Sequence, residues 1–158
     1  MNESKRILNI AAYKFVEIED LAELREKLRA KGGQLKLKGS ILLSPEGINM
    51  FLAGEPEPLR QLLDDLAIDT RFEGLEIKES WTPHQPFRRF LVKLKTEIIA
   101  FGIDGISPSK YTSPRISATE LQSWLREGRP LKLLDVRNDY EIEVGTFRGA
   151  APVGVNHF

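Results

Sequence analysis

Two groups of residues have types and spacings that could support chemistry. The first is Glu46 and Asn49 in the sequence SPEGIN, where a rigid bend could present an acid and an amide to a substrate. Turn chemistry alone, however, explains serine, proline and glycine at the first, second and fourth positions of a type I turn. A hairpin turn is therefore the favoured interpretation, and Asn49 is the residue that it leaves unexplained.

The second group is basic. The chain has 23 basic and 23 acidic residues, but the stretches 29–45 and 80–96 contain basic residues and no acid. The lysines there alternate with apolar residues, which predicts strands with lysines on the face opposite the buried one. That face could bind RNA phosphates, or it could be a solvated surface whose lysines discourage aggregation. No aromatic residue alternates with the lysines, and the pattern favours neither alternative. The candidate RNA-binding residues are Lys36, Lys38, Glu46, Asn49, Arg88, Arg89, Lys93 and Lys95.

Several other chemistries are excluded by composition. The chain has no cysteine, which removes disulfides, thiolate metal ligands and cysteine nucleophiles. Its two histidines are too few for a zinc site, and His84, between two prolines, is expected to be a surface residue. We therefore predict no catalytic residue, no metal and no cofactor in this chain. No apolar run resembles a signal peptide or a membrane span, which indicates a cytoplasmic protein.

The first half of the chain has alternating strand and helix patterns. Residues 7–15 are predicted to form a strand, and residues 19–33 a helix with Asp20 and Glu23 at capping-box spacing. The paired glycines Gly32 and Gly33 are expected to end this helix. Two further strands, beginning at Leu35 and ending at Leu52, flank the SPEG turn.

A second helix and two more strands follow. Residues 55–69 have a leucine stripe and prolines near the first turn, which predicts a helix. Strands are predicted at 75–81 and from Phe90 to Leu94, with an extension of the last one to Phe101 as an alternative end. The order is β-α-β-β-α-β-β, for which a ferredoxin-like sandwich with an antiparallel sheet is the economical α+β fold.

A change of composition separates this region from a second one. Residues 102–116 are rich in glycine, serine and proline and are predicted to form a linker. A helix is expected after Ser117, followed by a short buried strand in LKLLDV and a helix over 140–144 capped by Asn138 or Asp139. Such a helix and strand begin an α/β domain, which residues 117–158 are too few to complete.

Together these motifs resemble a known family. The sequence LLDVRNDYE…GTFRGA resembles the opening of a rhodanese-like domain. With LLSPEGIN and FRRFLVKLKTEIIAFG, the chain resembles the bacterial rhodanese-related tRNA uridine hydroxylases. The resemblance implies an acylphosphatase-like, ferredoxin-type domain at 1–101, a linker at 102–116 and the N-terminal part of a rhodanese-like domain at 117–158.

The resemblance also implies a function. Members of that family hydroxylate the wobble uridine of certain tRNAs in an oxygen-dependent reaction that gives 5-hydroxyuridine, in the cytoplasm. Their key residue is a rhodanese cysteine, which no residue here matches, so this chain is expected to bind tRNA without being catalytic by itself. Asp135 and Arg137 match the opening strand and are expected to be scaffold residues.

True acylphosphatases hold phosphate in a loop with glycine and arginine, but the corresponding sequence KFVEIED has neither and contains three acids, so acylphosphatase activity is rejected. The alternative to tRNA binding is a non-catalytic interaction module. In that alternative the truncated rhodanese segment packs on another chain, giving a homodimer.

Overall fold

The computed structural model describes residues 6–98 and 110–154 of the chain. The chain forms two compact units, Met1–Thr112 and Ser113–Phe158. Of the predicted linker, residues 102–109 lie outside the described part, and residues 110–116 contain neither helix nor strand. In the described ranges, no helix is both long and apolar enough to cross a membrane.

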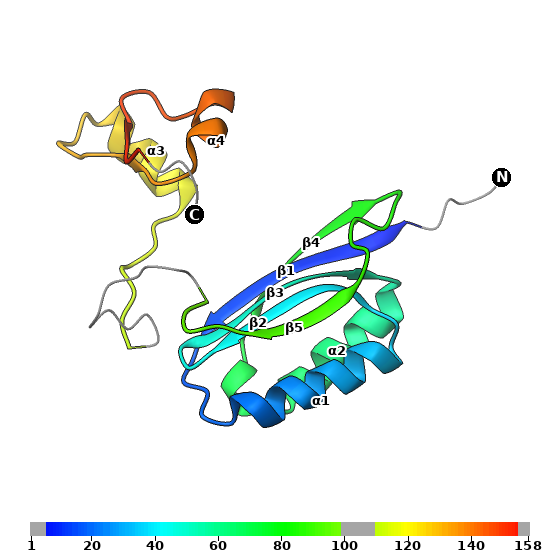
Figure 1. Cartoon of the computed structure of the whole chain (residues 1–158). Coiled ribbons are helices and arrows are strands. Elements are labelled where there is room, and N and C mark those ends of the chain that lie inside the picture. Colours follow the sequence, from blue (N-terminus) through cyan, green and yellow to red (C-terminus); the bar gives the residue numbers. More distant parts are fainter. Residues whose placement is uncertain (1–5, 99–109, 155–158) are drawn as a thin grey trace. The chain divides into compact units, whose positions relative to one another are not determined.

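The first unit is an α/β sandwich with one mixed sheet (Figure 1). Its elements are β1 (Ile7–Phe15), α1 (Leu21–Gln34), β2 (Lys38–Ser44), β3 (Gly47–Gly54), α2 (Pro56–Ala67), a 3-10 turn η1 (Thr70–Phe72), β4 (Glu76–Thr82) and β5 (Phe90–Leu94). The strand order is β4-β1-β3-β2-β5, and helices α1 and α2 cover one face of the sheet. This topology confirms the predicted ferredoxin-like α+β fold.

One feature of the sheet was predicted wrongly. The first four strands pair antiparallel, but β5 pairs parallel to β2, with Ile41 opposite Val92. β4 and β5 are at opposite edges of the sheet, and the loop 83–89 crosses the end of the sheet to join them. The predicted extension of β5 is absent over 95–98, and residues 99–101 lie outside the described part.

The core lies between the sheet and the two helices. Alternate residues of β1, β2 and β3 point toward the helices and are almost fully buried. Helix α2 contributes its predicted leucine stripe, with Leu59, Leu62 and Leu66 buried. Removing this apolar surface from water supplies the main driving force for the fold. The positions between the buried ones point to the opposite, open face of the sheet.

The ends of helix α1 differ from the prediction. Gly32 and Gly33 do not stop the helix, which continues to Gln34. Gly32 is buried because the Phe90 ring from β5 packs against it, so closely that a Cβ would lie 2.2 Å from the ring. The helix ends instead at Gln34, because Lys36 has a positive φ of 53° that turns the backbone out of the helical path. Asp20 is the N-cap residue, but its side chain caps no backbone group.

The second unit is small. It contains α3 (Ala118–Arg126), β6 (Leu134–Asp135), α4 (Asp139–Val144) and β7 (Ala151–Pro152), with β6 and β7 paired in parallel. Ser117 caps α3 by accepting a hydrogen bond from Glu120 N at 3.1 Å, as predicted. The expectation of a buried strand was wrong: β6 has two residues, and Leu134 is 65% exposed. Neither helix has a fully buried residue.

Candidate nucleic-acid interface

The SPEG sequence forms the predicted hairpin turn. β2 ends at Ser44 and β3 begins at Gly47, and these two residues are paired. The Ser44 hydroxyl is buried and accepts a hydrogen bond from the Glu46 backbone N–H at 3.2 Å. Gly47 has a φ of 149°, and a Cβ there would lie 2.1 Å from the carbonyl oxygen of Lys14. Both observations explain the motif by backbone geometry.

The turn is also bound to the loop between β1 and α1. Val16 N–H donates to the Glu46 carbonyl at 3.0 Å, and Ile18 N–H donates to the Pro45 carbonyl at 3.1 Å. The Glu46 carboxylate accepts a hydrogen bond from Ile98 N–H at 2.9 Å. Because its carboxylate already holds this backbone segment, Glu46 has a structural role in the folded chain.

The loop between β1 and α1 is the position at which an acylphosphatase would bind phosphate, so its charges and free donors matter. The N–H groups of Val16 and Ile18 are occupied by the turn, and Asp20 at the start of α1 is paired with Arg71. Arg71 also binds Asp69, with Nη2 to Oδ2 at 2.6 Å, and its hydrogen bonds lower the pKa of both carboxyl groups. A negatively charged loop with occupied donors does not suit an anion, which supports the rejection of acylphosphatase activity.

Three of the predicted RNA-binding residues lie on the open face of the sheet. Lys38 on β2, Asn49 on β3 and Lys93 on β5 alternate with residues that point toward the helices. The register places Asn49 and Lys93 in one cross-strand row, since both are opposite Leu42, whereas Lys38 is opposite Ala53 and lies further along the sheet. The predicted orientation of these two lysines is thus confirmed.

The other predicted residues lie elsewhere. Lys36 is in the turn after α1, before β2 begins, so it is not a strand residue of the open face. Arg88 and Arg89 are exposed in the loop before β5, and Lys95 is exposed just after β5. Contact of any of these residues with RNA stays a prediction.

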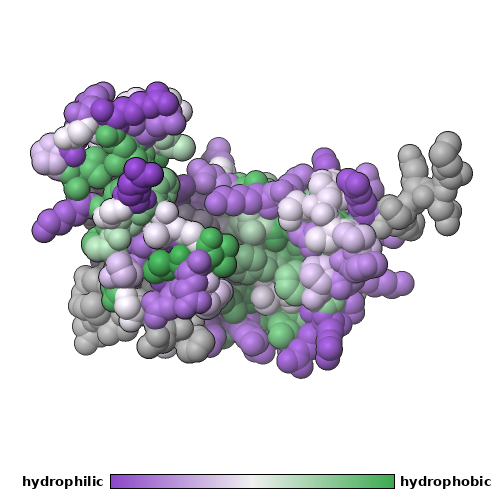
Figure 2. Space-filling model, turned by 90° about the horizontal axis from the view of Figure 1, so that it is seen from above, coloured by the Kyte–Doolittle hydropathy of each residue, from purple (hydrophilic) through white to green (hydrophobic). Residues whose placement is uncertain are grey.

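Sequence analysis missed three residues of the open face. Tyr13 on β1 and Phe51 on β3 are 38% and 47% exposed, and Lys78 on β4 lies opposite Ala11. An available signal was that Tyr13 and Phe51 alternate with buried residues on their own strands. In Figure 2 the molecule is seen from the side of this face, and an apolar area of the sheet has hydrophilic margins.

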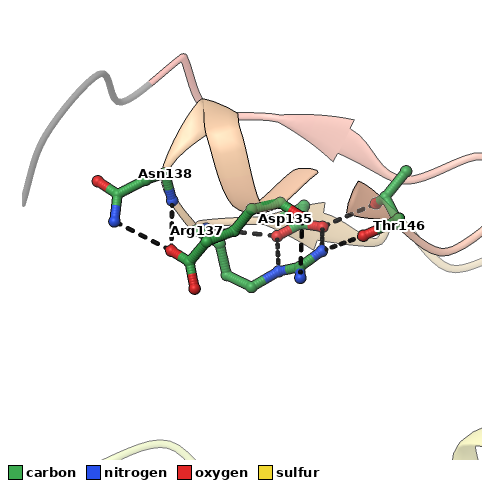
Figure 3. A network of polar contacts seen from close by, with 6 residues as sticks. Asp135, Arg137, Asn138 and Thr146 are labelled. Atoms are coloured by element: carbon green, nitrogen blue, oxygen red, sulfur yellow. Dashed lines mark hydrogen bonds and ion pairs between the residues drawn. The ribbon is translucent and has the colours of Figure 1, made fainter. Parts of the chain in front are cut away.

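The candidate scaffold residues form a network within the second unit (Figure 3). The Asp135 carboxylate accepts hydrogen bonds from Arg137 Nη2 at 2.6 Å, Arg137 Nε at 2.8 Å and the Thr146 hydroxyl at 2.7 Å. Arg137 Nη2 also donates to the Gly145 carbonyl at 2.7 Å. The bonds from Arg137, and then that from Thr146, lower the pKa of Asp135 well below its usual range. The network therefore ties β6 to the segment after α4.

The remaining candidates offer no catalytic arrangement. His84 is exposed, as expected, and its carbonyl accepts a hydrogen bond from the Thr82 hydroxyl at 2.8 Å. Among the residues that the structure describes, no cluster of three histidine or acidic side chains could hold a metal ion.

The fold and this face define the class of the first unit. It is an acylphosphatase-like α+β domain whose loop between β1 and α1 is acidic, and whose open sheet face has lysine and aromatic side chains. Residues 7–98 match the UPF0176 acylphosphatase-like domain, and the chain belongs to this family.

Curated relatives extend the similarity beyond that domain. The chain is 50% identical over 159 residues to a tRNA uridine(34) hydroxylase of Variovorax paradoxus, covering 98% of this chain and 60% of the relative. It is 47% identical to a protein of the same name from Bordetella parapertussis, covering 96% of this chain and 64% of the relative. The chain thus spans less than two thirds of the length of these relatives.

Solved structures give weaker matches. An acylphosphatase from Bacillus subtilis matches with a TM-score of 0.43 and 13% identity, over 56% of this chain and 98% of that one. The BLUF protein BlrB matches with a TM-score of 0.46 and 14% identity, over 56% of this chain and 74% of that one. Neither match bears on function.

Proposed function

We propose that this chain is the N-terminal portion of an enzyme that hydroxylates the wobble uridine of tRNA, and that the portion itself binds tRNA. The observation that carries this proposal is the 50% identity over 98% of the chain to a protein named tRNA uridine(34) hydroxylase. A cytoplasmic location is part of the proposal, because tRNA is used there.

The second unit is proposed to be the N-terminal part of a rhodanese-like domain, with Asp135 and Arg137 as scaffold. Their support is the hydrogen-bond network, in which the carboxylate and guanidinium hold backbone and hydroxyl groups of the same unit. The chain has no cysteine, so the rhodanese thiol of the proposed enzyme must be supplied outside these 158 residues. We expect no 5-hydroxyuridine from this chain incubated alone with tRNA and oxygen.

The first experiment measures tRNA binding by this chain as a function of salt. A fluorescently labelled tRNA transcript with uridine at position 34 should bind with an affinity that falls as salt rises, because lysines displace counterions from phosphates. The double variant Lys38→Ala/Lys93→Ala should reduce the magnitude of the salt slope by about 1.4, at roughly 0.7 per phosphate contact.

A control variant away from this face separates an effect of the open sheet face from an effect of total charge. Lys27 is exposed on α1, the helix that covers the other face of the sheet. Lys27→Ala should leave the salt slope unchanged. Absence of tRNA binding at low salt, or an equal effect of the control, would refute the proposal.

Self-association through the second unit is the alternative candidate. Its support is a set of exposed apolar side chains, among them Leu134 at 65%, Tyr140 at 60%, Val144 at 90% and Phe147 at 60%. Light scattering after size exclusion tests it. A stable dimer that Val144→Asp dissociates, together with no tRNA binding, would favour this function over the first.

A further inference from the structure

We propose that the open face of the sheet is a base-stacking platform for single-stranded RNA, on which Phe51 and Tyr13 each stack one base. This inference rests on the proposed function and goes beyond it. It names the part of the RNA that is recognised, unpaired bases, and it assigns two binding residues that carry no charge.

The strand register brings the two aromatic residues together. Tyr13 on β1 is opposite Asn49 on β3, and Phe51 lies two residues further along β3. Tyr13 and Phe51 are therefore diagonal neighbours on one face, at about 7 to 8 Å. Both strands are inner strands of the sheet, so both rings lie near its centre.

The surroundings of Phe51 leave room for a flat group. Its neighbours across the two adjacent strands are Ala11 and Ser40, which are both small. The ring is 47% exposed, and the small side chains on either side of it do not cover its faces. A large apolar ring kept partly in water at the centre of a sheet does little for the core, because the helices cover the other face.

Tyr13 is held by a second aromatic residue. The ring centroids of Tyr13 and Phe15 are 5.9 Å apart with an interplanar angle of 72°, an edge-to-face contact. This contact restricts the orientation of the Tyr13 ring, which lowers the entropy lost when a base stacks on it.

The charges on this face are three lysines and one acid near the rings, Glu76, which lies opposite Tyr13 on β4. Lys78 lies in the same cross-strand row as Phe51, and Lys93 lies in the same row as Tyr13. Lys38 is a third lysine on this face, at the first residue of β2. In the described part of the chain no ion pair joins these lysines to an acid.

This arrangement favours unpaired RNA over other partners. Lysines lie on both edge strands, β4 and β5, while the aromatic rings lie on inner strands, so phosphates and bases can be bound at the same time. Ferredoxin-like sheets that recognise RNA use aromatic side chains of the sheet to stack two or three bases. The bases of a duplex are already stacked on each other and cannot reach the rings.

The test uses the whole chain with two probes, a labelled single-stranded oligoribonucleotide of about ten nucleotides and a blunt duplex of the same sequence. Phe51→Ala and Tyr13→Ala should each weaken single-strand binding by roughly 5- to 150-fold and leave duplex binding unchanged. Phe51→Leu keeps an apolar side chain but removes the ring, so it should lose as much as Phe51→Ala. Phe51→Trp should bind as well as the wild type.

Trp81 provides a matched control. It is 47% exposed, as Phe51 is, but it lies opposite Leu8, a core residue, and so belongs to the other face of the sheet. Trp81→Ala should bind the single strand like the wild type. Circular dichroism of each variant must match that of the wild type, and Phe51→Trp serves as the folded reference.

The outcomes separate this inference from the proposed function. If tRNA binds with the expected salt slope but Phe51→Leu equals the wild type, base stacking is wrong and tRNA binding stands. An equal loss on the duplex would also overturn stacking. If the wild type binds no RNA and Phe51→Ala disrupts a dimer, the face is a protein contact, and both proposals fail.

Discussion

The two adjacent glycines of helix α1 should respond oppositely to alanine. A Cβ at Gly33 meets nothing within 4 Å, so Gly33→Ala gains only the helix preference of alanine over glycine, about 1 kcal/mol. A Cβ at Gly32 would lie 2.2 to 2.9 Å from three atoms of the Phe90 ring, so the ring must move. Overpacking of this kind costs about 1 to 3 kcal/mol.

The net change at Gly32 follows from these two contributions. The gain in helix preference offsets part of the overpacking, which leaves a loss of up to about 2 kcal/mol for Gly32→Ala. The two variants should therefore differ by up to about 3 kcal/mol in the free energy of unfolding. In a Phe90→Ala background the clash disappears, and Gly32→Ala should become stabilising by about 1 kcal/mol.

Urea unfolding followed by tryptophan fluorescence can measure these differences. The chain has two tryptophans, Trp81 in the first unit and Trp124 in the second, so a Trp124→Phe background makes the signal report the first unit alone. If Gly32→Ala proved as stabilising as Gly33→Ala with Phe90 present, the packing of the ring on the helix would be wrong.

Three further results are expected. Gly47→Ala should cost about 3 kcal/mol in urea unfolding, because its Cβ meets a backbone carbonyl and its φ is positive. Gly74→Ala, with a φ of 71° and no neighbour within 4 Å, should cost only about 1 kcal/mol. Equal costs would argue against the clash. The lowered pKa of Asp69 makes its ion pair with Arg71 stabilise the fold fully above the unfolded pKa of about 3.9 and progressively less below it. As the pH is lowered below that value, the melting temperature should therefore fall less in Arg71→Gln than in the wild type. Parallel curves of melting temperature against pH would contradict this. Thr146→Val removes a donor to Asp135, so the carboxyl titration followed by carbon NMR should move to higher pH; an unchanged midpoint would exclude the hydroxyl as a cause.

Much of the first unit could be predicted because its elements bury one face each. Strand β1 was predicted with its observed ends, Ile7 and Phe15, since alternation of apolar residues is a local property. The leucine stripe of α2 and the SPEG hairpin are equally local. The end of α1 could not be predicted, because a glycine pair normally ends a helix and only the Phe90 ring explains why Gly32 lies inside one.

The candidate interface depends on pairing that the sequence does not contain locally. No single strand has both a lysine and an aromatic residue on the open face. The two types share that face because β1 and β3 lie between β4 and β2. The parallel pairing of β5 is likewise set by the crossing of the loop 83–89. In the second unit, the strand in LKLLDV was expected to be buried because it is apolar. Burial also requires neighbouring elements that pack against the strand, and a local apolar pattern contains no information about them.

The central place of β1 in the sheet has a consequence for synthesis of the protein. Its first partner, β3, is complete only at Gly54, about 40 residues after β1 ends. At typical translation rates the ribosome needs roughly 2 to 8 s to add that length. During this interval the sequence ILNIAAYKF has no strand to pair with, whereas the β2–β3 hairpin can close as soon as it emerges. Rapid translation of residues 16–54 would shorten the time in which this segment can aggregate.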